Sequence, residues 1–385
     1  MRLIKVKVKK ILTLALENIL KCFWIFPLKK DQVLFLSFNG KQYSDNPLYI
    51  CKYIKDKNPR RKAIWVLSSK DDTPTYCDLV VSPKSFKYYY YFCTSKTIIT
   101  NNHISSFLPV RKKQVVLNTW HGGGCMKRVA FASKTPNPSD KFFFKVQNKK
   151  YSAFCSTSKF VDKKLFRDSF HYNGELLPVG MPRNDILFSY NESIVDKVYK
   201  YFNIQRGEKT GLILYAPTFR GSANSAEFNP SQIAEIFKCI DLLNKKFNKE
   251  FVFLFRAHHT MTFDVKDQNV VIATDYPDMQ ELLCASDILI TDYSSCSYDF
   301  SLMKKPIFLF VPDMDKYDKE QGFYLSIDKQ PFPYGVTLDD FKNAIECFDE
   351  QDYLKKIETY HKQIGCYDHG CATEKTYMWL KEKWK

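Results

Sequence analysis

The sequence predicts an α/β protein with two doubly wound domains in tandem that face a central cleft. Short apolar runs, typical of buried strands, alternate with amphipathic helical segments through most of the 385 residues. The alternation pauses in a polar stretch at residues 191–208 and then resumes, which indicates two separate series of strands. The most polar motifs follow strands directly, at the position where open α/β sheets bind their ligands.

The first series of strands belongs to a mostly parallel sheet. Each strand is a run of apolar and β-branched residues bounded by polar or turn-forming residues. We expect strands at residues 33–38, 63–67, 79–82, 97–100, 115–119, 153–156 and 176–179. Helical segments at residues 47–57 and 86–93 lie between them, as crossover connections of a parallel sheet require.

The second series follows a charged helix and a hinge within residues 191–208. We expect its strands at residues 212–215, 251–255, 270–273, 287–290 and 307–310, with helices at residues 232–247, 279–285 and 338–348. The predicted divisions are therefore a segment of residues 1–30, a first domain of residues 31–205 and a second domain of residues 206–385.

The segment of residues 1–30 is basic and amphipathic. Its only acid is Glu17, and its basic residues are Arg2, Lys5, Lys7, Lys9, Lys10, Lys21, Lys29 and Lys30. The apolar run at residues 11–28 is interrupted by polar side chains and does not read as a membrane-spanning helix. We expect this segment to lie in a membrane interface, with Phe23, Trp24 and Phe26 as anchors. The alternative is an ordinary N-terminal helix packed on the protein.

Composition narrows the classes of partner. A formal net charge of +16 indicates a polyanionic partner, and nucleic acid, an acidic membrane surface and phosphorylated substrates all qualify. No nucleic-acid-binding signature is present, so a nucleic-acid partner is not expected. The 12 cysteines form no C-x-x-C pair and indicate a reducing, cytosolic compartment. The spacing of His361, Cys366, His369 and Cys371 matches no zinc pattern, so we predict no metal site.

The most informative motif is ASDILITDYSSCSYDF at residues 285–300. A buried strand ends at a polar turn, and an apolar helical segment follows. Such a turn directs the amides of a helix N-terminus at an anion. The hydroxyls of Ser294 and Ser295 can both donate to phosphate oxygens. The motif therefore predicts phosphate binding.

Other strand ends carry residues suited to the same chemistry. His121 follows the strand at residues 115–119 and precedes Gly122, Gly123 and Gly124, which let a ligand approach the backbone. A histidine there can act as a general base, although it can also be a structural residue that caps the turn. Arg220 and Arg256 follow two strands of the second series, where guanidinium groups bind phosphate or serve as surface charges.

Taken together, these motifs resemble the CDP-glycerol glycerophosphotransferase family, the teichoic-acid primases and polymerases of bacterial envelopes. The resemblance runs from residue 31 almost to the end of the chain. Its motifs are YSDNP (43–47), TWHG (119–122), GMPRND (180–185), YAPTFR (215–220), RAH (256–258), SDILITDYSSCSYDF (286–300), QGFY (321–324) and DHGCATE (368–374).

The resemblance implies a GT-B-like fold and a peripheral enzyme at the cytoplasmic face of the bacterial cell membrane. Such enzymes transfer glycerol phosphate, ribitol phosphate or another polyol phosphate from a CDP-activated donor to a hydroxyl of a lipid-linked or glycan acceptor. The acceptor hydroxyl attacks the phosphorus that bears the polyol, and CMP leaves in teichoic-acid or capsule synthesis. No acidic Mg²⁺ cluster of the kinase kind is evident, and no cofactor is expected.

The resemblance also implies roles for individual residues. His121 matches the catalytic base, and His258 is a second catalytic residue that engages the donor pyrophosphate with Arg256. Donor binding is expected at Thr218, Arg220, Arg256, Asp292, Ser294 and Ser295, and the acceptor-side residues or loops at Gly122, Gly123, Lys127 and Arg183. His259 is expected to point away from the donor, because side chains alternate along a strand.

Two other functions stay open from the sequence. A sugar-nucleotide glycosyltransferase can use the same fold and would release a nucleoside diphosphate instead of CMP. A membrane adaptor without catalysis would use the positive charge alone. The sequence also leaves open which polyol is used and whether the protein forms a homo-oligomer.

Overall fold

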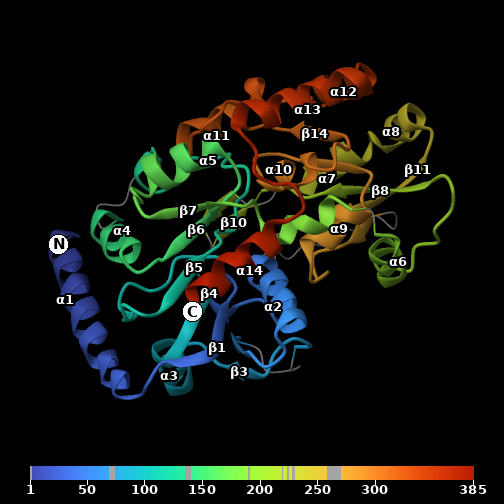
Figure 1. Ribbon diagram of the computed structural model, residues 1–385. Helices are drawn as coiled ribbons and strands as arrows, with labels where there is room; N and C mark the ends of the chain where they lie inside the picture. Colours follow the sequence, from blue (N-terminus) through green and yellow to red (C-terminus); the bar gives the residue numbers. More distant parts are fainter. Residues whose placement is uncertain are drawn as a thin grey trace. The chain divides into compact units, whose positions relative to one another are not determined.

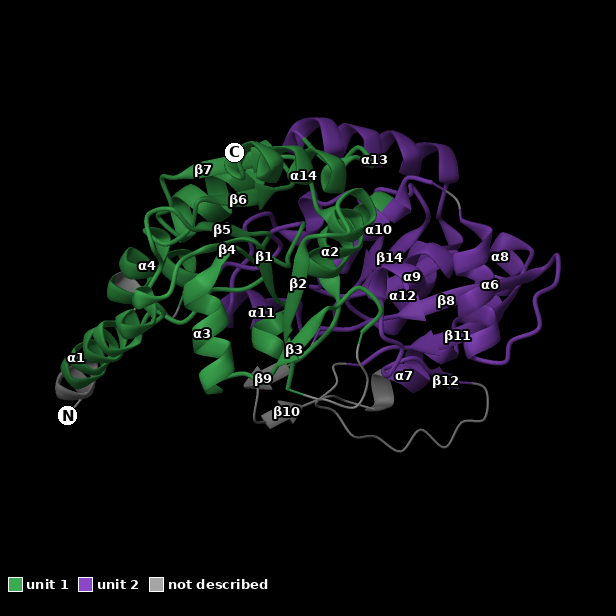
Figure 2. Cartoon of the chain, turned by 60° about the horizontal axis from the view of Figure 1, so that its bottom comes forward, with its two compact units in different colours: residues 1–123, 129–185, 366–385 green, residues 124–128, 186–365 purple. Residues whose placement is uncertain are grey.

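The computed structural model describes residues 2–68, 74–134, 140–189, 191–218, 220–222, 225–227, 230–257 and 270–385. The chain divides into two compact units, drawn in green and purple in Figure 2. Unit 1 contains Met1–Gly123, Val129–Asp185 and Cys366–Lys385, and unit 2 contains Gly124–Arg128 and Ile186–Gly365. This division differs from the one expected at residue 205, because the chain enters unit 2 at residue 186 and its last twenty residues return to unit 1.

Unit 1 contains a seven-stranded parallel sheet in the order β3-β2-β1-β4-β5-β6-β7 (Figure 1). The strands are β1 (Lys29–Leu36), β2 (Lys62–Val66), β3 (Leu79–Val81), β4 (Ser95–Thr100), β5 (Val115–Asn118), β6 (Ala153–Ser156) and β7 (Glu175–Pro178). The chain builds outward from β1 on one side and from β4 on the other. The strand order therefore reverses between β1 and β4, and their carboxyl ends form a topological switch point.

The strands of unit 1 form where the sequence is apolar on both faces, as a sheet covered by helices requires. The rings of Phe35 in β1 and Trp65 in β2 stack 5.2 Å apart inside the core. The helices are α1 (Arg2–Leu20), α2 (Asp45–Lys57), α3 (Phe86–Thr94), α4 (Asp140–Asn148), α5 (Lys159–Val161), which continues into a π-helix at Asp162–Ser169, and α14 (Ala372–Lys383).

The C-terminal helix α14 belongs to unit 1 because aromatic contacts hold it there. Tyr377 packs against Tyr53 of α2 at 5.3 Å between ring centroids. The indole of Trp384 donates a 2.7 Å hydrogen bond to Thr97 Oγ1 in β4, and the Arg61 guanidinium lies 3.4 Å from its ring centroid. The end of the chain thus completes the core of the first sheet.

The N-terminal segment consists of α1 and a 3-10 helix at Lys21–Ile25, and it packs on unit 1. The sequence interpretation of Phe23 as a membrane anchor is wrong. Its side chain is 5% exposed and packs edge-on against Phe86 of α3 at 5.0 Å between ring centroids. The first strand begins at Lys29, so the expected segment boundary at residue 30 falls inside β1. Within the part of the chain described, no helix is long and apolar enough to cross a bilayer.

Unit 2 contains a six-stranded parallel sheet in the order β12-β11-β8-β13-β14-β15. Its strands are β8 (Thr210–Tyr215), β11 (Glu250–Phe255), β12 (Val270–Ile272), β13 (Ile288–Thr291), β14 (Ile307–Phe310) and β15 (Tyr334–Gly335). Strand order reverses between β8 and β13, which makes a second switch point. Each unit is therefore doubly wound, as the sequence predicts.

The helices of unit 2 are α6 (Glu192–Tyr201), α7 (Pro230–Phe237), α8 (Ile240–Phe247), α9 (Met279–Ala285), α10 (Cys296–Ser301), α11 (Met314–Glu320), α12 (Leu338–Glu346) and α13 (Glu350–Ile364). The single helix expected at residues 232–247 is two helices, because a tight turn at Cys239 bonds back to Ile236 and redirects the chain. A two-stranded hairpin, β9 (Arg220–Ser222) and β10 (Ser225–Glu227), was not expected.

Candidate active site

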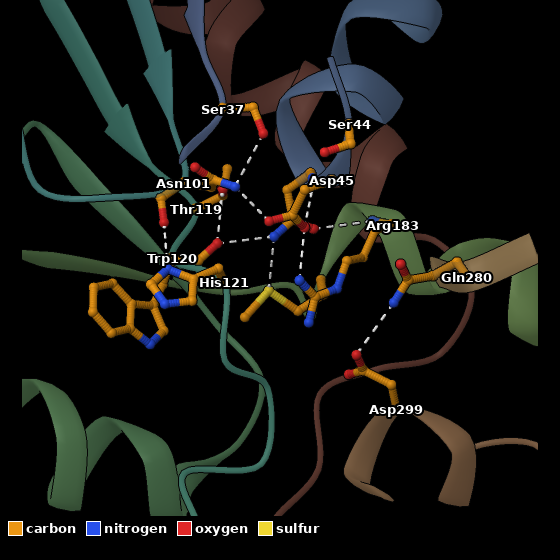
Figure 3. A network of polar contacts seen from close by, with 12 residues as sticks. Ser37, Ser44, Asp45, Asn101, Thr119, Trp120, His121, Arg183, Gln280 and Asp299 are labelled. Atoms are coloured by element: carbon orange, nitrogen blue, oxygen red, sulfur yellow. Dashed lines mark hydrogen bonds and ion pairs between the residues drawn. The ribbon is translucent and has the colours of Figure 1, made fainter. Parts of the chain in front are cut away.

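The polar residues of unit 1 gather at the carboxyl ends of β1, β4 and β5, at the first switch point (Figure 3). Ser37 follows β1, Asn101 follows β4, and the segment from Thr119 to His121 follows β5. The backbone N–H of Thr119 donates to the carbonyl oxygen of Thr100 at 2.7 Å, which continues the pairing of the two strands past their ends. Adjacent parallel strands therefore deliver these side chains to one place.

His121 is held in one orientation and one tautomer. Its Nδ1 lies 2.8 Å from the main-chain carbonyl oxygen of Asn101. A carbonyl oxygen only accepts hydrogen bonds, so Nδ1 carries the proton and Nε2 carries the lone pair of the neutral ring. The ring packs on Trp120 at 4.3 Å between centroids and is partly exposed. A partly exposed imidazole with a defined basic nitrogen is suited to general-base catalysis.

Trp120 sets the direction of the chain at His121. Its φ of 55° lies in the left-handed region, which a bulky side chain rarely adopts. Three side chains hold this conformation. The amide of Trp120 donates to Asn118 Oδ1 at 2.9 Å, and its carbonyl oxygen accepts from Asn46 Nδ2 at 3.0 Å and from Thr119 Oγ1 at 3.1 Å. An unfavourable backbone conformation persists only where the surroundings impose it, and such positions cluster at functional sites.

A buried polar network surrounds the backbone of this segment. Arg183 Nη1 and Asp45 Oδ1 form an ion pair at 2.7 Å, with 8% and 5% of their side chains exposed. Asn101 Nδ2 donates to Asp45 Oδ2 at 2.5 Å, and the amide of Arg183 donates to Asn46 Oδ1 at 3.0 Å. Arg183, expected among the acceptor-side residues or loops, thus has its guanidinium buried against Asp45.

A second histidine of unit 1 is structural. His103 is half-buried, and its Nδ1 lies 3.1 Å from the hydroxyl of Tyr151. Burial, together with the charge of nearby His121, lowers the pKa of His103 to about 3. It is therefore neutral at physiological pH and supports the aromatic packing beside Trp120, whose ring centroid lies 5.4 Å away.

The three glycines after His121 differ in exposure and in their contacts. Gly122 is partly exposed, whereas Gly123 is buried and its carbonyl oxygen accepts a 2.7 Å hydrogen bond from Thr157 Oγ1. Gly124 belongs to unit 2, where an added Cβ would lie 2.6 Å from the Cβ of Tyr298. Only glycine fits there. Lys127 is exposed and its backbone pairs with that of Phe323. Of the three residues expected in this acceptor-side loop, Gly122 and Lys127 are accessible and Gly123 is buried.

In unit 2, Asp292 links the turns that follow β8 and β13. Its Oδ1 accepts from the amide of Thr218 at 2.7 Å and from the amide of Tyr293 at 2.5 Å. Thr291 Oγ1 donates to the carbonyl oxygen of Ala216 at 2.7 Å between the same two turns. Asp292 is buried, so it holds the two turns of the second switch point together and is not exposed at their surface.

Ser294 and Ser295 are the partly exposed members of a buried turn. The helix after them, α10, has only six residues. Its first amides already bond within the turn, since Ser297 donates to the carbonyl oxygen of Ser294 at 3.3 Å and Tyr298 to that of Ser295 at 3.1 Å. The sequence predicts that helix amides and hydroxyls both bind an anion, whereas the geometry leaves the hydroxyls as the better-placed donors.

Arg256 is largely buried and braces the loop between β12 and α9. Its Nη1 donates to the carbonyl oxygens of Ala273 at 3.0 Å and Tyr276 at 2.7 Å. Burial lowers the pKa of the guanidinium, and nearby Asp278 opposes that shift. Arg220 lies in β9, while His258 and His259 lie outside the described residues, so their predicted places are not tested.

Sequence reasoning missed Asn46, Asp45 and Asn101, whose side chains bond to the backbone and side chains around His121. Asn101 directly follows the strand predicted at residues 97–100, so the strand-end rule that selected His121 applies to it as well. Asp45 and Asn46 stand in the YSDNP motif, but nothing in the sequence shows that their partners are Arg183 and Asn101, which are far along the chain.

A family model described as CDP-Glycerol:Poly(glycerophosphate) glycerophosphotransferase matches residues 19–381. The chain is 30% identical to the teichoic acid poly(glycerol phosphate) polymerase of Staphylococcus epidermidis, over 90% of this chain and 50% of that protein. It is 26% identical to the teichoic acid glycerol-phosphate transferase of Staphylococcus aureus, over 97% of this chain and 98% of that one. The teichoic acid ribitol-phosphate primase of Bacillus spizizenii is 26% identical and covers 91% of both chains.

Solved structures show the same architecture. The wall teichoic acid polymerase TagF superimposes with a TM-score of 0.82 and 26% identity, over all of this chain and 97% of that chain. The chain spans about half the length of the first two curated polymerases that it matches. The GT-B-like fold expected from the sequence is thereby confirmed.

Proposed function

Because the chain belongs to the CDP-glycerol:poly(glycerophosphate) glycerophosphotransferase family, we propose that it transfers a polyol phosphate from a CDP-activated donor to an acceptor hydroxyl. The polyol is glycerol or ribitol, since both kinds of enzyme occur among its relatives. The acceptor is a lipid-linked or glycan hydroxyl of the cell envelope. The names of those relatives place the same kind of transfer in teichoic-acid synthesis, and we propose that role for this chain.

The reaction needs one proton acceptor and one site for the pyrophosphate. The acceptor hydroxyl attacks the phosphorus that bears the polyol and loses its proton to Nε2 of His121. A phosphodiester bond forms, the bond to the bridging oxygen of the pyrophosphate breaks, and CMP leaves with the electron pair. The 2.8 Å bond from Nδ1 of His121 to the carbonyl oxygen of Asn101 is the observation that carries this assignment, because it leaves the basic lone pair on Nε2.

The donor binds to unit 2 in this proposal. The partly exposed hydroxyls of Ser294 and Ser295 donate to phosphate oxygens, and Asp292 holds the turn that presents them. Hydrogen bonds to a charged phosphate are stronger than neutral ones, so two hydroxyls contribute substantially to affinity. His258, Arg220, Thr218 and Arg256 remain proposed donor-binding residues, with Arg256 acting partly through the loop that it braces.

We further propose that α1 docks the protein on an anionic membrane surface at the cytoplasmic face. The helix is packed with its polar side inward: Thr13 is buried, and Glu17 forms a 3.5 Å ion pair with Lys150. Lys9 and Lys10 lie over the rings of Phe143 and Phe142 in α4, and α1 lies beside α4 in Figures 1 and 2.

The outer side of α1 is apolar, which is unusual for a helix that meets water. Ile11 is 67% exposed, Ile19 64%, and Ile25 in the following 3-10 helix 83%. Val8, Leu12, Leu14, Leu16, Trp24 and Phe26 are exposed as well. Apolar side chains bordered by lysines are the composition of interfacial helices, and lysines are attracted to anionic lipids. An acidic bilayer therefore fits this surface in both polarity and charge.

The test of the proposed reaction is a single substitution in unit 1. With CDP-glycerol as donor, His121→Ala should lower turnover by ~10²–10⁴-fold, the usual contribution of a general base. Donor affinity measured by calorimetry should stay unchanged, because His121 does not belong to the donor turn. His171→Ala, an exposed histidine of the same unit, is the matched control. Turnover near that of the unmodified protein in a folded His121→Ala variant would contradict the proposal.

A further inference from the structure

We propose that Asp45 is a positioning residue for His121, and this inference rests on the proposed function of His121 as the base. Asp45 does not touch the imidazole. Its carboxylate instead accepts hydrogen bonds from Asn101 and Asn46. Asn101 supplies the carbonyl oxygen that His121 contacts, and Asn46 donates to the carbonyl oxygen of Trp120, the residue before His121 (Figure 3).

The first connection runs through Asn101. Asp45 Oδ2 accepts from Asn101 Nδ2 at 2.5 Å, while Asn101 Oδ1 accepts from the backbone amide of Phe38 at 2.8 Å. Both ends of the Asn101 side chain are therefore engaged, and its amide group has one allowed orientation. The residue so fixed supplies the carbonyl oxygen that accepts the proton of His121 Nδ1. The tautomer of the proposed base thus depends on the position of Asn101.

The second connection runs through Asn46. Asp45 Oδ1 accepts from the backbone amide of Asn46 at 2.7 Å, and Asn46 Nδ2 donates to the carbonyl oxygen of Trp120 at 3.0 Å. Trp120 has a φ of 55°, so an external contact is needed to hold its peptide group. The same carboxylate therefore stabilises, through Asn46, the backbone immediately before His121. Through Asn101, it also stabilises the residue whose carbonyl oxygen His121 contacts.

The chemistry of the site requires a carboxylate at residue 45. The groups that face its oxygens are all donors: the amide of Asn46, Asn101 Nδ2 and Arg183 Nη1. An ionised carboxylate only accepts, whereas an asparagine amide would turn an NH₂ group toward one of these donors. Asn101 cannot simply flip in response, because its Oδ1 would then leave the amide of Phe38.

Asp45→Asn is therefore an isosteric change that turns an NH₂ group toward at least one donor without altering side-chain volume. The φ of residue 45 is 63°, and asparagine tolerates this left-handed conformation as well as aspartate does. The substitution thus changes the hydrogen-bond polarity at residue 45 and not its backbone preference.

The experiment measures kcat and KM for CDP-glycerol in Asp45→Asn, alone and combined with His121→Ala. Misplacement of a catalytic group by about 1 Å costs up to ~10²-fold in rate, so we expect a ~10–100-fold fall in kcat. KM for CDP-glycerol should change less than ~2-fold, because the proposed donor residues lie in unit 2. In the His121→Ala background, Asp45→Asn should cause no further loss, since a positioning residue has no effect once its target is gone.

Two controls separate positioning from loss of fold. Asp185→Asn removes a partly buried carboxylate of unit 1 that accepts from the amides of Ala372 and Thr373, away from His121. It should lower thermal stability without a selective loss of kcat. Asn101→Ala leaves the pair of Asp45 and Arg183 in place and removes the link to Asp45 together with the bond to the amide of Phe38, and it should reproduce the kcat loss in folded protein.

The outcomes distinguish this inference from the proposed function. Full activity of His121→Ala alone contradicts the proposed reaction. A normal kcat in folded Asp45→Asn, or an equal loss from Asp45→Asn with and without His121, overturns the positioning role while leaving the base assignment intact. A loss confined to KM overturns it as well.

Discussion

Removing the cation beside Asp45 should destabilise unit 1 strongly. Arg183→Met keeps most of the side-chain volume and deletes the guanidinium that pairs with Asp45 at 2.7 Å. The two side chains are 8% and 5% exposed, so water cannot replace the lost partner without opening the core. An unpaired buried carboxylate is the costly product of this substitution.

The structure sets the size of the effect. Breaking a buried ion pair from one side costs ~3–5 kcal/mol, whereas an exposed pair contributes ~0–1 kcal/mol. The carboxylate of Asp45 also accepts from Asn46 and Asn101, so a shift of Asp45 would weaken these bonds as well. We therefore expect the loss for Arg183→Met to lie in the upper part of that range. Lys164→Met is the matched control in unit 1, because Lys164 and Asp168 lie 3.5 Å apart with 39% and 47% of their side chains exposed.

Tryptophan fluorescence can follow unit 1 alone. The five tryptophans of the sequence are Trp24, Trp65, Trp120, Trp379 and Trp384, and all belong to unit 1. Urea unfolding at pH 7 should show a loss of ~3–5 kcal/mol for Arg183→Met and below ~1 kcal/mol for Lys164→Met. A loss for Arg183→Met no greater than for Lys164→Met would show that Arg183 and Asp45 are not a buried, mutually dependent pair.

Three further perturbations concern the donor turn, a half-buried histidine of unit 2 and the outer side of α1. Ser294→Ala combined with Ser295→Ala should weaken CDP-glycerol binding by ~1.5–3 kcal/mol per lost bond to phosphate, and an unchanged Kd in calorimetry would remove both hydroxyls from the donor site. Burial and the charge of Lys304 lower the pKa of His361 from 6.5 to about 4. Below pH 6.5 the unfolded chain therefore binds a proton at His361 that the folded protein does not bind, and the free energy of unfolding falls. Between pH 7 and pH 5 the unmodified protein should therefore lose at most ~2 kcal/mol more than His361→Gln in urea unfolding, and equal losses would exclude this linkage. Ile11→Gln combined with Ile19→Gln should lower sedimentation with anionic vesicles about tenfold, at ~0.8 kcal/mol per buried CH₂, and the exposed Met378→Gln is the control; undiminished sedimentation would place the membrane contact elsewhere.

The strands could be predicted because their sequences are apolar on both faces. β14 was predicted with the bounds that it has in the structure, and β8, β11 and β13 differ from prediction by one or two residues at an end. β15 has only two residues and was missed, because a short strand has no periodicity to detect. The break at Cys239 was missed because the apolar pattern continues through both α7 and α8.

The chemistry of the site was only partly readable. His121 could be selected because it follows a strand and precedes glycines, which is a local signal. Arg183 is expected among the acceptor-side residues or loops through the family resemblance alone, and its burial against Asp45, 138 residues earlier, leaves no local signal in the sequence. Phe23 is misassigned because an aromatic residue fits a membrane interface and a protein core equally well. Whether such residues are buried or exposed depends on partners that are distant in the chain, and a single sequence does not reveal those partners.

The identity of the nucleotide product distinguishes polyol-phosphate transfer from glycosyl transfer. The purified protein should be incubated with CDP-glycerol or CDP-ribitol and a lipid-linked glycan that carries a free hydroxyl, and the nucleotides separated by chromatography. We expect acceptor-dependent release of CMP, one molecule for each polyol phosphate incorporated, with His121→Ala giving almost none. Release of CDP, or incorporation that continues at the same rate in His121→Ala, would contradict polyol-phosphate transfer by this base.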